Sequence, residues 1–142
     1  MNRSHDFWIF LSLCWFASCA PGGKGSPPPP NDPVPGGVVV AQGRFTGLNS
    51  KTVEGVAVVY RSLTSPSLFT VRLEGISAPS ELGLEVQASI STGRVLQTSL
   101  RSSQGTQNYT VEVLGNPVWV SVSIHSSIKD LDYGKAILSD GS

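Results

Sequence analysis

The chain has few charged residues and no excess of either sign. Of its 142 residues 14% are charged, and ten basic and ten acidic side chains cancel to a formal net charge of zero. Proteins that bind nucleic acid or an anionic surface usually carry clustered Lys and Arg. We therefore expect no nucleic-acid partner and no electrostatic attraction to anionic lipid.

Sulfur is also scarce, because the chain holds only two cysteines, Cys14 and Cys19, and a single methionine at position 1. If the first residues are a cleaved leader and Cys19 is modified, the folded part has no disulfide, free thiol or soft metal ligand. A haem would then need a histidine or tyrosine as its axial ligand. We expect no cofactor, but haem stays open through His125, Tyr60, Tyr109 or Tyr133.

Long apolar runs are absent as well. The longest, residues 7–17, has about 11 residues, whereas a helix needs ~20 to cross a bilayer. It follows a short polar start that contains Arg3, which is the layout of a secretory signal. Phe16-Ala17-Ser18-Cys19 then resembles a bacterial lipobox, whose leader is cleaved before the cysteine and whose thiol receives a diacylglyceryl group.

This motif predicts a lipoprotein signal peptide over residues 1–18 and lipidation of Cys19. Several acyl chains would hold the protein on a membrane of the cell envelope. Ala20 after the cysteine favours the outer membrane if the host is a diderm bacterium. An ordinary signal peptide or an uncleaved anchor stays possible, whereas Cys14 is a poor lipidation site because the bulky Leu13 precedes it.

Residues 19–37 are dominated by proline and glycine, with four consecutive prolines at 27–30. Proline cannot donate to a helix or sheet ladder, and the segment has few large apolar residues. We expect a tether between the lipid and the folded domain, residues 38–142, with a reach of roughly 30–50 Å.

The rest of the chain alternates apolar and polar residues with a period of two, which indicates half-buried strands. In residues 68–74, for example, Phe69 and Val71 share one face, while Arg72 and Glu74 share the other, which should face water. Turn residues separate the strands, and no stretch has helical periodicity. The pattern predicts an all-β domain, an antiparallel β-sandwich of about eight short strands whose two sheets pack face to face. We expect these strands near residues 38–45, 53–61, 68–74, 84–91, 94–100, 109–113, 118–125 and 133–138.

A more specific pattern is Gly105-Thr106-Gln107-Asn108-Tyr109, with Leu100-Arg101 before it and Tyr133-Gly134 near the end of the chain. These motifs, together with Gly43-Arg44-Phe45 at the start, resemble the DM-thirteen domain, a β-sandwich family related to DOMON domains. Members of the family are often exported, and the resemblance implies an electron-transfer role. That role depends on a cysteine eight positions before the glycine matched by Gly134, and this chain has Ser126 there, preceded by His125. The family's redox residue is therefore missing.

The residues around position 125 also suggest two other kinds of site. His125 and Ser126, with Asp130 and Asp132 nearby, supply the residue types of a hydrolase triad, but adjacent strand residues point to opposite faces. The two aspartates could also bind Ca²⁺, although a calcium loop usually has more oxygen ligands. We expect no enzyme activity and no metal site.

We give the Gly105–Tyr109 motif a structural interpretation. Gly105 should adopt a positive φ, Asn108 should bond back to the turn backbone, and Tyr109 should bury its ring while its hydroxyl finds a main-chain partner, like a tyrosine corner. The whole sequence thus predicts an exported, lipid-anchored protein that displays a non-catalytic binding module, with an envelope protein as a possible partner. The alternative is an electron-transfer or haem-binding module of the DM-thirteen type.

Overall fold

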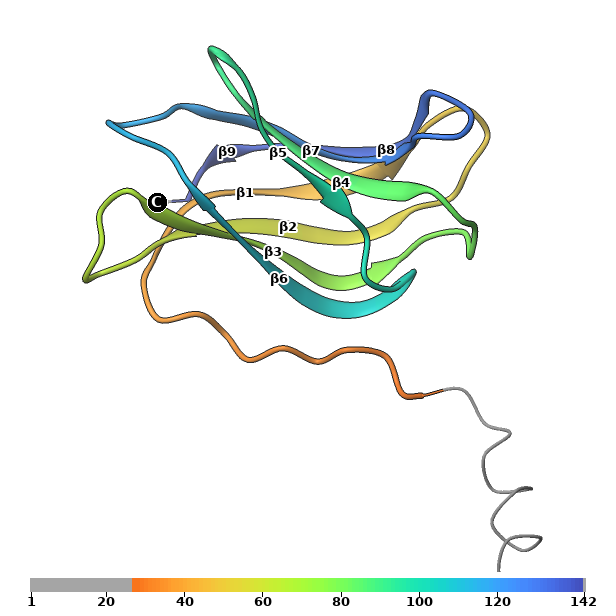
Figure 1. Cartoon of the computed structure of the whole chain (residues 1–142), viewed down its shortest axis with the longest axis horizontal. Helices are drawn as coiled ribbons and strands as arrows, with labels where there is room; N and C mark the ends of the chain where they lie inside the picture. Colours follow the sequence, from red (N-terminus) through yellow and green to blue (C-terminus); the bar gives the residue numbers. More distant parts are fainter. Residues whose placement is uncertain (1–26, 142) are drawn as a thin grey trace, which may run out of the picture.

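The computed structural model describes residues 27–141, which form antiparallel strands joined by short connections (Figure 1). This confirms the all-β prediction. Within the described range no helix is long and apolar enough to cross a membrane. The strands are β1 (Val38–Gly47), β2 (Glu54–Arg61), β3 (Leu68–Ser77), β4 (Leu84–Ile90), β5 (Gly93–Ser99), β6 (Gln104–Glu112), β7 (Trp119–Ser126), β8 (Leu131–Ile137) and β9 (Ser139–Asp140).

The strands form one continuous, nearly closed, barrel-like sheet in the order β5-β4-β7-β8-β1-β2-β3-β6, with β9 beside β1. The sequence predicted two separate sheets, and β1 explains the difference. Its first part pairs with β2, from Val38 opposite Arg61 onward, and its last three residues pair with β8. Alternation along a strand is the same whether strands belong to two sheets or one, so the sequence could not reveal this link.

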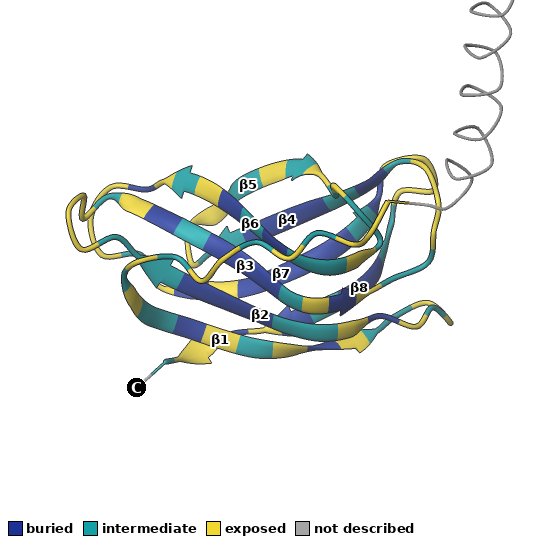
Figure 2. Ribbon diagram, turned by 90° about the horizontal axis from the view of Figure 1, so that it is seen from below, coloured by how far each residue is buried: buried dark blue, intermediate teal, exposed yellow. Residues whose placement is uncertain are grey.

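The inward faces of the strands supply a single core, seen as the dark blue bands of Figure 2. Phe69 on β3 and Trp119 on β7 meet across it, with ring centroids 5.3 Å apart in an edge-to-face arrangement. Such aromatic pairs add to the free energy already gained by burying their area. Tyr133 on β8 is fully buried in the same core.

Antiparallel pairing sorts the connections into two ends of the domain (Figure 1). The β1–β2, β3–β4, β5–β6 and β7–β8 connections lie at one end, which we call the groove end. The β2–β3 and β6–β7 connections lie at the other, the far end. The two ends are about 30 Å apart, the length of a ten-residue strand at ~3.3 Å per residue.

A tether was expected over residues 19–37, but residues 30–33 of this stretch run along the free edge of β6 and parallel to it. Asn31 forms a parallel bridge with Thr106. The Asp32 amide donates to the Thr106 carbonyl at 3.1 Å, and the Thr106 amide donates to the Pro30 carbonyl at 2.8 Å. Prolines keep their carbonyl acceptors, so the segment can pair with β6 although it offers few donors of its own. It thereby covers an edge strand, which proteins usually protect.

Candidate functional site

A groove of about 280 Å³ opens at the groove end of the domain. Three backbone contacts hold its walls together: the Leu100 amide donates to Leu84, the Ala78 amide to Ser103, and the Ser127 amide to Gly83, all at 2.8–2.9 Å. Five serines contribute to the lining. The complete lining is Ser80, Glu81, Leu82, Gly83, Leu84, Glu85, Ser99, Leu100, Arg101, Ser102, Ser103 and Ser127.

Glu81 contacts a tyrosine hydroxyl and two lysines at this groove. The buried Tyr133 donates its hydroxyl proton to Glu81 Oε1 at 2.5 Å, and the ammonium groups of Lys129 and Lys51 lie 3.5 and 3.8 Å from the carboxylate. The hydrogen bond from Tyr133, followed by the two lysines, lowers the pKa of Glu81. A hydrogen bond between the side chains of Lys129 and Tyr133, followed by the negative charge of Glu81, raises the pKa of Lys129. The groove therefore keeps a carboxylate fixed at its rim.

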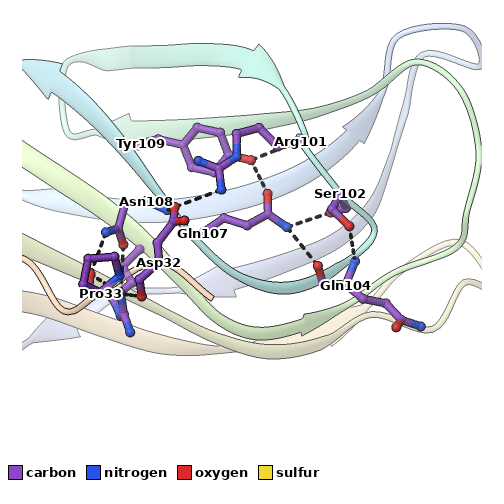
Figure 3. Close-up of polar contacts among 9 residues, drawn as sticks. Asp32, Pro33, Arg101, Ser102, Gln104, Gln107, Asn108 and Tyr109 are labelled. Atoms are coloured by element: carbon purple, nitrogen blue, oxygen red, sulfur yellow. Dashed lines mark hydrogen bonds and ion pairs between the residues drawn. The ribbon is translucent and has the colours of Figure 1, made fainter. Parts of the chain in front are cut away.

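A hydrogen-bond chain behind the groove links the β5–β6 connection to β6 (Figure 3). The Arg101 amide donates to the Tyr109 hydroxyl at 3.0 Å, and that hydroxyl donates to Gln107 Oε1 at 2.5 Å. Gln107, fully buried, donates through Nε2 to the carbonyls of Ser102 and Gln104. Burial raises the pKa of Tyr109. The hydroxyl thus has a main-chain partner, and the tyrosine-corner prediction is confirmed.

The same network continues to the N-terminal segment through Asp32 (Figure 3). Its Oδ2 accepts the Asn108 amide at 2.9 Å and lies 2.9 Å from Nη2 of Arg101. The hydrogen bond from Asn108 and the Arg101 guanidinium lower the pKa of Asp32. Asp32 therefore joins the docked segment both to β6 and to the groove.

Arg72 on β3 is the second anchor of the segment, and sequence reasoning missed it. Its Nη1 donates to the carbonyls of Asp32 and Pro33 and to Asn108 Oδ1, at 2.8–3.0 Å. Its Nε pairs with Glu74 at 2.9 Å. The strand pattern placed Arg72 on a wet face, but the segment covers that face and leaves the residue only 6% exposed.

Gly105 and Gly134 each lie where a side chain would collide with a neighbouring residue. Gly105 has φ 105°, as predicted, and a Cβ there would lie 2.5 Å from the Pro30 carbonyl oxygen. Gly134 allows a different close approach, because its Cβ would lie 2.6 Å from Cβ of Val53. Gly105 lies inside β6 rather than in a turn. The prediction for Asn108 was wrong, since its Nδ2 donates to the Pro33 carbonyl and not to a turn.

His125 and Ser126 do not form a nucleophile and base pair. Nδ1 of His125 lies 2.8 Å from Asp132 and Nε2 lies 3.4 Å from Asp130, so both ring nitrogens face carboxylates. Ser126 is buried, and its hydroxyl accepts the Lys129 amide at 3.0 Å. The polar atoms of both side chains therefore contact residues in or next to the β7–β8 turn, and not each other.

The donor set also fits poorly to the haem that the DM-thirteen resemblance left open. The nitrogens of His125 face Asp130 and Asp132, and the hydroxyls of Tyr109 and Tyr133 are held in the hydrogen bonds above. Tyr60 on β2 does not line the groove. In residues 27–141 there is also no cluster of three or more His, Cys, Asp or Glu side chains that could hold a metal ion, the two aspartates included.

The predicted lipidation site, Cys19, lies outside the described residues, as does the leader. Comparison with protein-family models, curated proteins and solved structures finds no match to this chain.

Proposed function

We propose that this chain is an exported lipoprotein, anchored to the cell envelope through Cys19, that displays a non-catalytic β-domain as a binding module. The lipobox-like sequence ending at Cys19 supports the anchor. The domain's contribution is a polar groove at one end of a rigid sheet.

The observation that carries the non-catalytic part is the state of His125 and Ser126. A hydrolase needs a nucleophile within hydrogen-bond distance of a base that can take its proton. Here the Ser126 hydroxyl accepts a hydrogen bond from the backbone amide of Lys129. The imidazole of His125 lies between the carboxylates of Asp130 and Asp132. These contacts stabilise the β7–β8 turn and support a structural role for both residues.

The groove suits a small polar ligand or a polar loop of an envelope protein. Its serine hydroxyls can both donate and accept hydrogen bonds, while Glu81 and Arg101 supply one charge of each sign. A volume of about 280 Å³ is at the lower limit of the pockets that hold drug-sized molecules. We therefore favour a short polar group over a large cofactor as the occupant.

We also propose that the domain is a divergent DM-thirteen β-sandwich in which β1 joins the two sheets. In support, the rings of Phe69 and Trp119 meet edge to face across the core, as side chains of two packed layers would. The electron-transfer role implied by this resemblance has no matching cysteine here, because Ser126 stands at that position. Purified protein should be colourless, and a Soret band in its visible spectrum would favour the haem-carrying alternative.

Membrane fractionation of the native host tests the anchored part. Wild-type protein should sediment with membranes and enter the detergent phase, because acyl chains gain ~0.8 kcal/mol per buried methylene. Cys19→Ala should become soluble or stay as an unprocessed precursor. Cys14→Ala is the matched control and should behave as wild type. If Cys19→Ala fractionated as a fully processed membrane protein, the proposal would fail.

A further inference from the structure

Two strongly exposed apolar side chains project at the groove end. Leu82, in the β3–β4 connection, is 85% exposed, and Ile128, in the β7–β8 turn, is 69% exposed. Each has a large hydrophobic side chain at the tip of a connection, where polar residues are usual. We call them the apolar pair.

The apolar pair belongs to one local structure. Gly83 follows Leu82 directly, and a Cβ on Gly83 would lie 2.8 Å from two side-chain carbons of Ile128. The amide and hydroxyl of Ser127 both donate to the Gly83 carbonyl, at 2.9 and 3.0 Å. The two connections are therefore held side by side, so that the pair can meet one surface together.

The chain leaves the domain at this same end. Residues 30–33 run parallel to β6, and Pro29 and Pro30 lie against Gly105 at its beginning. Toward lower residue numbers the segment therefore points past the start of β6, at the groove end of the domain (Figure 1). Arg72, Asp32 and Asn108 fix that direction.

Docking also shortens the tether. Between Cys19 and Pro27 there are eight Cα-to-Cα steps, which span at most about 26–29 Å when fully extended. A tether that ended at Val38 would have 19 steps and an upper limit of about 63–68 Å. An anchor on Cys19 therefore keeps the groove end within about 26–29 Å of the bilayer, whereas the far end can lie up to about 30 Å farther away.

We infer that the groove end faces the membrane, and that the apolar pair inserts into the headgroup boundary of the bilayer. The inference rests on the proposed lipidation of Cys19. The short tether makes the contact intramolecular, so a weak apolar interaction is enough to orient the domain.

Charge does not drive this contact. The lysines facing this end, Lys51 and Lys129, are paired with Glu81, and Asp130 adds an exposed carboxylate. Anionic lipid would therefore gain no net attraction, and the contact should be equally strong on phosphatidylcholine and insensitive to salt.

The test uses lipidated protein reconstituted in phosphatidylcholine vesicles, with one spin label at a time. The mature chain offers no competing thiol once Cys19 is acylated, so L82C and I128C can be labelled selectively. The matched controls are L63C and L114C, at far-end residues that are 74% and 83% exposed. We expect collision with a water-soluble nickel complex to fall several-fold at positions 82 and 128 on vesicle binding, and to stay unchanged at 63 and 114.

The mass of the same sample separates the two possible failures. If Cys19 carries acyl chains but all four labels remain equally accessible, the orientation is wrong and the proposed anchor stands. If Cys19 carries no acyl chain, the anchor and the orientation both fall. A fall at all four positions would also overturn the inference, because the domain would then lie on the bilayer without a preferred end.

Discussion

Nη1 of Arg72 lies 2.8 Å from the carbonyl oxygen of Pro33, so a buried guanidinium on β3 holds a proline-rich segment that precedes the first strand. This contact makes the segment part of the domain. It also sets the end at which the chain leaves the domain and the length of any tether to Cys19.

Arg72→Met should release the segment while keeping most of the packing of the side chain. Hydrogen bonds to charged groups contribute about 1.5–3 kcal/mol each, and three of them bind the segment and Asn108 together. We expect hydrogen exchange at the Asp32 and Thr106 amides to accelerate by at least about tenfold, which corresponds to ~1.4 kcal/mol. Arg94→Met, on exposed β5, is the control and should leave both amides protected.

Gly105→Ala should dislodge the same segment by a steric route. The new methyl would lie 2.5 Å from the Pro30 carbonyl oxygen, at φ 105°. Gly115→Ala is matched for backbone strain, since Gly115 has φ 80° and nothing lies within 4 Å of its Cβ position. Proteolysis should cut residues 27–33 faster only in the Gly105 variant. Equal cleavage in both variants would mean that the segment does not pack against Gly105.

Two substitutions at Tyr109 should separate the contributions of its ring and of its hydroxyl to the free energy of unfolding. Tyr109→Ala should lower the free energy of unfolding by ~3–5 kcal/mol through the lost packing. Tyr109→Phe keeps the ring and removes the partner of the Arg101 amide and of Gln107, at an expected ~1–3 kcal/mol. Urea unfolding measures both. A Tyr109→Ala variant as stable as wild type would show that this residue is not part of the core.

Acid should loosen the segment through Asp32. Because the Asn108 amide and Arg101 lower the pKa of Asp32, its stabilising contribution is complete above the ordinary aspartate pKa of ~3.9 and is lost as the pH falls through the lower folded value. The Asn108 amide resonance should therefore shift below about pH 4 in wild type. Asp32→Asn should show no such transition, and an identical titration in that variant would assign the effect to another carboxyl group.

The strands were predictable because each buries one face, and period-two alternation reports that directly. The burial of Tyr109 was predictable for the same reason. The positive φ of Gly105 was predictable from its residue type, but its place inside β6 was not. Arg72 was not, because alternation gives the side of the sheet on which a residue lies, and not what covers that side. The docking of the proline-rich segment was not predicted, because prolines have no amide hydrogen to donate to a sheet. The segment docks instead through its carbonyl oxygens, which accept hydrogen bonds from β6 and Arg72. The continuous sheet could not be predicted from the sequence either, because it depends on β1 changing its pairing partner from β2 to β8 along its length.

The mass of the mature protein, purified from membranes of its native host, decides whether Cys19 carries the anchor. We expect a chain that begins at Cys19 and carries a diacylglyceryl group on the thiol. A mature chain that begins elsewhere, or one that keeps Cys19 as an unmodified thiol, would contradict it.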